Sequence, residues 1–251
     1  TRAGVQQSRE SQTELGEGLY FSAAAAYQSG KFNDATHLSR ITANSLLLGT
    51  GLRYHQGDWV ISGAVDWAYS WYDSRRTVVI ADSTATARAA PRGWQLGAHV
   101  YTAYGIDLGR ATIRPFADLH AIYVRANSFV ESGASPFNLD VAGQGELAFI
   151  GGAGVEFDGR IALGKGATLR PFASAALTLN GASGWTTSAR FAGQSMQDRF
   201  TVSTAAPDYL GRFAIGVDIL GAKSIDFSIS YNPEIGRAYR SHTGNARLTY
   251  R

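Results

Sequence analysis

Apolar and polar residues alternate along most of the chain, and this period of two is its dominant pattern. Between positions 59 and 71 every odd residue is apolar or glycine, whereas the even residues include Ser62, Asp66 and Ser70. Successive side chains of a strand point to opposite faces, so the segment predicts a strand with one apolar face. The segments at 92–106 and 110–125 repeat the pattern. No apolar run reaches the length of about 18 residues that a transmembrane helix needs.

The pattern predicts ten strands whose connections alternate between short and long. The expected strands are residues 18–28, 45–55, 58–72, 92–106, 110–125, 146–158, 167–180, 208–220, 223–235 and 240–251. Short turns are expected at 56–57, 107–109, 159–166 and 221–222, and longer loops at 29–44, 73–91, 126–145 and 181–207. Outer-membrane barrels have short periplasmic turns and longer external loops. With ten strands, both chain ends would lie on the periplasmic side.

Charge separates the two faces of these strands. The more apolar faces carry charge only at their outermost positions, which are Arg92, Arg125, Lys223 and Arg240. A lysine or arginine facing lipid costs roughly 2–4 kcal/mol at the midplane, whereas a water-filled lumen imposes no such cost. The asymmetry predicts an all-β, antiparallel transmembrane β-barrel. A soluble sandwich or propeller also alternates, but its strands of about 5–6 residues are shorter than the roughly 11–16 expected here.

The inward faces are predicted to line the lumen with charged and imidazole side chains. These lumen residues are Arg53, Asp66, His99, Arg114, Asp118, His120, Glu156, Arg170, Arg212 and Asp218. We interpret their basic and acidic members as counter-charges that stabilise the wall and form a polar path. Aromatic residues near strand ends on the apolar face suit the membrane interface. They are Trp59, Trp71, Trp94, Tyr104, Tyr123 and Tyr231.

Catalysis inside the lumen is the alternative reading of two of these residues. A simple hairpin would place His99 near Asp118, and such a pair can orient a general base. Ser174 faces inward on another strand, but nothing in the sequence places it as a nucleophile. We therefore predict no catalytic residue. An outer-membrane lipase or protease would need that geometry.

Composition limits the remaining chemistry. The chain has 251 residues, no cysteine and a net charge of +3, which is too mild to indicate a nucleic-acid partner. The other histidines show no metal-ligand spacing, and these are His37, His55 and His242. Glycines at 151–154 lie within an expected strand that precedes no helix, so they do not form a phosphate loop. Neither a metal nor a cofactor is predicted.

Several segments, in their order and spacing, resemble the C-terminal β-barrel domain of autotransporters, the type V secretion family. They are Leu52-Arg53-Tyr54, Gly57-Asp58-Trp59, Trp71–Arg76, the strand ATIRPFADLHAIYV at 111–124, the similar ATLRPFASAAL at 167–177, and the tail 231–251 with Gly236 and Arg240. The resemblance covers about residues 18–251. It leaves 1–17 as a polar lead-in for which a helix and a loop both fit.

The resemblance implies a twelve-stranded barrel with a helix through its pore, in the outer membrane of a Gram-negative bacterium. Such a domain anchors an N-terminal passenger and supports its export to the cell surface, without being an enzyme. The implied partners are outer-membrane lipid, the passenger, the barrel-assembly machinery and periplasmic chaperones. This chain departs from the family in its ten expected strands, which resemble the third to twelfth, and in ending at Arg251 rather than an aromatic residue. Those departures suggest that the first strands are lacking. A porin-like channel is the other membrane alternative.

Overall fold

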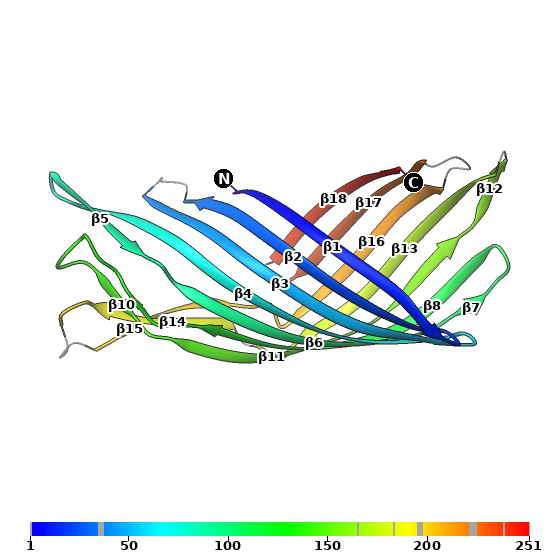
Figure 1. Ribbon diagram of the computed structural model, residues 1–251, viewed down its shortest axis with the longest axis horizontal. Helices are drawn as coiled ribbons and strands as arrows, with labels where there is room; N and C mark the ends of the chain where they lie inside the picture. Colours follow the sequence, from blue (N-terminus) through cyan, green and yellow to red (C-terminus); the bar gives the residue numbers. More distant parts are fainter. Residues whose placement is uncertain are drawn as a thin grey trace.

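The chain folds into one long antiparallel sheet and a small second sheet, and no helix is assigned in the described residues. The structure, a computed structural model, describes residues 2–34, 38–164, 166–182, 184–194, 198–220, 225–237 and 239–250. Figure 1 shows the long sheet coiling, so that β1 to β4 slope one way across the view and β13 to β18 slope the other way. Among the described residues, no helix is long and apolar enough to cross a membrane.

The long sheet is built from neighbours in sequence order. Its continuous path is β1 (Arg2–Gly16), β2 (Leu19–Asn33), β3 (Ser39–Gln56), β4 (Trp59–Ile80), β6 (Arg92–Tyr104), β8 (Ala111–Ala126), β11 (Gln144–Gly159), β13 (Ala167–Asn180), β16 (Tyr209–Leu220), β17 (Ile225–Gly236) and β18 (Tyr239–Tyr250). Three short strands attach to it, namely β5 (Ser83–Ala89) beside β4, β7 (Ile106–Asp107) beside β8 and β12 (Ile161–Gly164) beside β13. The ten expected strands are all present, although the turn at 221–222, Lys223 and Arg251 lie outside the described residues.

Strand β1 corrects the prediction for the start of the chain. A helix or loop was expected over residues 1–17, but Arg2–Gly16 pairs with β2 almost throughout, from Arg2 opposite Phe32 to Glu14 opposite Tyr20. Pairing explains this outcome, because β2 would otherwise present a row of unpaired backbone groups. The turn that follows β1 is made by Gly18, whose φ of 79° suits glycine.

Because of this extra strand, the first described residues lie at a different end of the barrel from the one expected. Arg2 lies opposite Phe32, beside the connection between β2 and β3, whereas the last residues of β18 pair with the first residues of β17. The two ends of the described chain therefore lie at opposite ends of the barrel. The prediction that both are periplasmic is wrong, because it was based on an even number of strands.

Many large apolar residues of the long sheet are exposed on its outer face. Val100, Leu119 and Ile215 are 55%, 51% and 62% exposed, and in the described part of the chain no large side chain is fully buried. The buried hydrophobic residues there are alanines and one valine. A soluble sandwich would bury the large residues between its sheets. This arrangement matches a barrel whose outer face contacts lipid.

The long connections contain ordered structure that the alternation pattern did not predict. Strand β4 continues to Ile80 and forms a hairpin with β5, although 73–91 was expected to be a loop. Parts of 126–145 and 181–207 form the second sheet, in the order β15 (Phe200–Ala205), β14 (Gly184–Phe191), β10 (Leu139–Val141) and β9 (Phe129–Val130). These strands gather at one end of the long sheet, on the left of Figure 1.

Candidate functional site

The inner face of the long sheet encloses two cavities that share part of their lining. One of about 340 Å³ is lined by residues of β6, β8, β11, β13, β16 and β17, and the other, of about 470 Å³, by residues of β3, β4, β6, β8 and β11. His99, Tyr101 and Glu156 border both. Strands from β3 to β17 thus turn one common polar face toward the lumen, and this face is the candidate site.

A long-range ion pair on the inner face joins two strands that are not neighbours in the sheet. Arg212 on β16 places Nη2 3.3 Å from Oδ1 of Asp118 on β8, and the Asp118 side chain is only 5% exposed. The two strands are separated in the sheet by β11 and β13, so small residues must lie beneath the pair. Gly152 on β11 does so, because a Cβ there would lie 2.6 Å from Asp118 Oδ1 and 3.1 Å from Arg212 Nη2.

A second group of charges lies nearer the short turns. Arg114 on β8 forms ion pairs with Glu156 on β11, at 3.2 Å, and with Asp158 on the same strand. Arg170 on β13 approaches the other oxygen of Asp158, with Nη2 3.8 Å away. Asp158 was missing from the predicted set, although it follows Glu156 by two residues and shares its face. Extending the alternation to the end of the strand would have identified it.

The two histidines of the predicted set lie against each other. His99 on β6 is directly opposite His120 on β8, and their rings stack at 3.8 Å between centroids with 15° between planes. His120 Nε2 lies 3.3 Å from Asp118 Oδ2. The carboxylate therefore contacts His120, and His99, which the sequence placed near Asp118, has a ring nitrogen within 4.8 Å of it. Ser174 borders the same cavity and forms no hydrogen bond to either imidazole in the described part of the chain.

The remaining predicted lumen residues are spread along the wall. Arg53 borders the larger cavity together with Arg114 and Glu156. Asp66 lies directly over Gly97 of the neighbouring strand, where any Cβ would collide with its carboxylate. Asp218 is opposite Arg170 in the pairing of β13 with β16 and borders a separate cavity with Arg247. These charges therefore occupy several levels of the lumen.

The predicted interface aromatics form contacts at two levels of the outer face. Trp59 and Tyr104 are 5.1 Å apart between ring centroids at the short-turn end, and Trp94 and Tyr123 are 5.2 Å apart at the other end. Trp71, at the second level, follows Trp59 by twelve residues on the same strand. Twelve residues extend about 40 Å along a strand, which corresponds to a height of about 29 Å across the membrane at a tilt of about 45°. The apolar band of such barrels is about 25 Å tall. Tyr231 lies between the levels, opposite Ile215.

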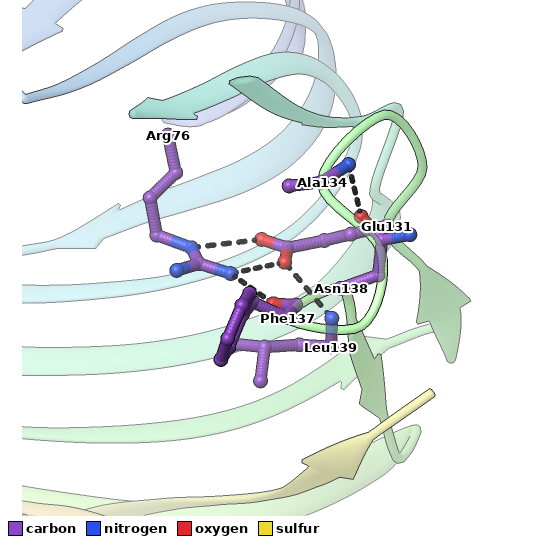
Figure 2. Close-up of polar contacts among 6 residues, drawn as sticks. All are labelled: Arg76, Glu131, Ala134, Phe137, Asn138 and Leu139. Atoms are coloured by element: carbon purple, nitrogen blue, oxygen red, sulfur yellow. Dashed lines mark hydrogen bonds and ion pairs between the residues drawn. The ribbon is translucent and has the colours of Figure 1, made fainter. Parts of the chain in front are cut away.

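Outside the barrel wall, an ion pair anchors one long connection. Arg76 on β4 donates from Nε and Nη2 to the two oxygens of Glu131, at 3.2 and 2.5 Å, and from Nη2 to the carbonyl of Phe137 at 3.1 Å. Figure 2 shows Glu131 between this guanidinium and the backbone N–H of Leu139, which donates to it at 2.9 Å. The Glu131 side chain is 9% exposed. The clamp joins the β4–β5 hairpin to the second sheet.

The second sheet has its own charged centre. The Asp140 carboxylate on β10 accepts from Arg190 Nε at 2.8 Å and from Arg199 Nη2 at 3.1 Å. The hydrogen bond from Arg190, followed by that from Arg199, lowers the pKa of Asp140 from its ordinary value of 3.8, against the opposing effect of burial. The ionised form is therefore the one that stabilises this sheet.

A coiled antiparallel sheet with apolar side chains outside and paired charges within defines an outer-membrane β-barrel with a polar lumen. The structure resembles the translocator domain of the autotransporter NalP from Neisseria meningitidis, with a TM-score of 0.74, 17% identity, and coverage of 99% of this chain and 81% of that one. It also resembles the β-domain of the Bordetella autotransporter BrkA, with a TM-score of 0.62, 14% identity, and coverage of 99% and 90%. No curated protein sequence matches the chain. At these identities the likeness establishes the fold.

The sequence itself establishes the family. The model of the autotransporter β-domain family matches residues 4–232, and the chain belongs to that family. The chain is accordingly an outer-membrane translocator and anchor for a passenger in a Gram-negative bacterium, as the sequence resemblance implied. The matched region begins inside β1, within the segment that sequence analysis had left as a lead-in.

Proposed function

We propose that the charged lumen is the passage along which the passenger crosses the membrane, and that it carries out no catalysis of its own. The pairing of lumen charges supports this proposal most directly. Arg114 contacts Glu156 and Asp158, and Arg212 contacts Asp118, so fixed charges of both signs neutralise each other along the wall. A wall with balanced charge attracts neither acidic nor basic segments strongly. It therefore suits an unfolded chain of any composition.

The same contacts argue against a catalytic triad. A serine hydrolase needs its nucleophile hydrogen-bonded to a histidine that a carboxylate orients. Here the carboxylate of Asp118 contacts His120 and Arg212, and His99 stacks on His120. Ser174 shares the cavity without joining this chain of contacts. We expect ester and peptide hydrolysis by the refolded barrel to stay at background, with no difference between the wild type and His99→Ala.

The chain is also proposed to use the barrel-assembly machinery and periplasmic chaperones for insertion. Its alternating strands expose large apolar residues on one side, such as Leu147 and Leu177, before lipid covers them. Such surfaces aggregate in water, so an unfolded barrel needs protection until it reaches the membrane. Depletion of the assembly machinery should leave the chain sensitive to protease in the periplasm, with no heat-modifiable barrel band on gels.

Cross-linking from neighbouring positions tests the passage. The chain contains no cysteine, so a single one can be introduced without interference. Ser174 borders the lumen cavity, and Ala175, the next residue, lies on the opposite, exposed face at the same depth. We expect Ser174→Cys to form a disulfide with a cysteine in a passenger stalled during export, and Ala175→Cys to form none. Equal cross-linking at both positions would contradict the proposal. So would a passenger that is exported without forming any cross-link to Ser174→Cys.

A further inference from the structure

A cluster of two imidazoles and one carboxylate lies on the lumen face of the paired strands β6 and β8. His99 is opposite His120, and Asp118 precedes His120 by two residues on the same face. One nitrogen from each histidine and one oxygen from Asp118 lie within 4.8 Å of one another. We propose that His99, Asp118 and His120 bind one divalent transition-metal ion of the zinc class.

To bind one ion, the three ligand atoms must approach from within 4.8 Å of one another to about 3.3 Å. Zinc binds nitrogen and oxygen ligands at about 2.0–2.2 Å in tetrahedral geometry, so ligand atoms on one ion are about 3.3 Å apart. His120 Nε2 and Asp118 Oδ2 already have that separation, at 3.3 Å. His99 needs the larger adjustment. Its ring now stacks on His120 and would tilt about its Cβ–Cγ bond to turn a nitrogen toward the ion.

His99 gives an independent reason to expect a ligand. Its Nε2 is buried and has no hydrogen-bond partner among the described residues. A buried polar atom without a partner costs about 1–3 kcal/mol, and such atoms in native structures call for an explanation. An ion bound to His99 would satisfy a ring nitrogen that the protein leaves unused.

Asp118 already has the support that metal-binding carboxylates receive from neighbouring groups. Its side chain is 5% exposed, and Oδ1 accepts from Arg212 while Oδ2 faces His120. Metal-binding carboxylates are usually held in this way, with one oxygen on the ion and hydrogen bonds from nearby donors. The guanidinium charge opposes a cation, but Glu234, opposite Arg212 in the pairing of β16 with β17, borders the same cavity and opposes that effect.

The donor set selects the class of ion. Imidazole suits zinc, copper and nickel, whereas calcium and magnesium take oxygen ligands. Three protein ligands leave one tetrahedral position, and the adjoining cavity of about 340 Å³ has room for water there. The sequence did not show this site, because the spacing of His99 and His120 becomes meaningful only when the two strands pair in this register.

Metal titration of the refolded, tag-free barrel tests the site, with Zn²⁺ followed by calorimetry and Cu²⁺ by electron paramagnetic resonance. We expect one equivalent of Zn²⁺ and a Cu²⁺ spectrum with coupling to two imidazole nitrogens. Removal of a residue that only supports a metal ligand lowers metal affinity by roughly 10- to 100-fold. His99→Gln and His120→Gln each remove a ligand, so each should lower the affinity for Zn²⁺ by more than that. His55→Gln, in the same lumen but outside the cluster, should bind as the wild type does.

Circular dichroism and heat-modifiable gel mobility establish that each variant is folded before titration. Bound Zn²⁺ should also raise the urea midpoint of the wild type and of His55→Gln, but not that of His99→Gln. The proposal is overturned if the folded wild type binds no Zn²⁺ at one equivalent. It is equally overturned if His99→Gln and His120→Gln bind as tightly as His55→Gln.

Discussion

Arg212 and Asp118 form a 3.3 Å ion pair although their strands, β16 and β8, are separated in the sheet by β13 and β11. Three strand spacings of about 4.8 Å amount to about 14 Å along the wall, so the arginine and the aspartate side chains must both extend toward each other. The two side chains meet over Gly152, where a Cβ would lie 2.6 Å from Asp118 Oδ1 and 3.1 Å from Arg212 Nη2, so the pair follows the inner wall across β13 and β11. This pair therefore links four strands of the wall, which contacts between adjacent strands do not.

Removing the arginine should destabilise the barrel. Arg212→Ala leaves the nearly buried Asp118 carboxylate with His120 as its remaining partner, and an under-satisfied buried group costs about 1–3 kcal/mol. We expect the urea midpoint in detergent to fall accordingly. Asp118→Asn in the same background should recover part of the loss, so the double-mutant cycle gives a non-zero coupling energy.

The control for this experiment is an exposed ion pair. Arg75 contacts Asp73 at 3.2 Å with both side chains more than half exposed, so Arg75→Ala should cost no more than about 1 kcal/mol. If Arg212→Ala is no more harmful than Arg75→Ala, the lumen pair is only an incidental contact.

Two adjacent glycines on β11 should respond differently to an added methyl group. Gly152→Ala forces Asp118 or Arg212 to move, since a Cβ there would lie 2.6 Å from the carboxylate, and overpacking of this kind costs about 1–3 kcal/mol. Gly151 faces outward, and its Cβ would meet Leu119 at an ordinary 3.8 Å. Gly151→Ala should therefore be neutral in urea unfolding. Equal midpoints for the two variants would show that the lumen side chains adjust freely.

Local periodicity explains which parts of this fold the sequence could predict. Alternation assigns a face to each residue, so ten strands and their lumen charges, such as Arg114 and Glu156, follow from the sequence alone. Strand β1 could not be found in this way, because the residues on both of its faces are polar. One face carries Gln7, Arg9 and Ser11, and the other carries Gln6, Ser8 and Glu10. Its strand state depends on pairing with β2.

The second sheet and the long-range contacts could not be predicted from the sequence for another reason. Strand β10 has three residues and pairs with β14, with Leu139 opposite Phe191, so no local pattern marks it. The contact of Arg212 with Asp118 and the stacking of His99 on His120 depend on the strand order and the register. Those properties belong to the arrangement of many strands together. No single segment contains them.

The same arginine substitution on opposite faces of β13 tests the membrane assignment. Ala175→Arg places a charge toward lipid near the middle of the strand and should cost roughly 2–4 kcal/mol in vesicles. Ser174→Arg places it in the lumen beside Glu156, its cross-strand neighbour, and should cost little. Unfolding by guanidinium in lipid vesicles measures both. A larger penalty for Ser174→Arg would reverse the assignment of the two faces.

The clamp at Arg76 should control the long connections without affecting the wall. Arg76→Ala removes both hydrogen bonds to Glu131 and the one to Phe137, which frees the segment between β9 and β10. We expect faster cleavage within 126–145 by protease added to intact cells, with the urea midpoint of the barrel unchanged. Arg75→Ala, one residue away, should leave the cleavage rate as it was. Equal cleavage of the two variants would show that the clamp does not hold this connection.

Acid should loosen the second sheet through Asp140. Because hydrogen bonds from Arg190 and Arg199 lower its pKa below 3.8 in the folded state, the ionised carboxylate stabilises the sheet fully above pH 3.8. That contribution is lost as the pH falls through the lowered folded pKa, where the proton displaces the arginine contacts. Hydrogen exchange of amides in β10 and β14 should therefore speed up at low pH, beyond the intrinsic pH dependence of exchange. Asp140→Asn should show raised exchange already at neutral pH and lack the acid step. An acid step that persists in Asp140→Asn would assign it to another carboxylate.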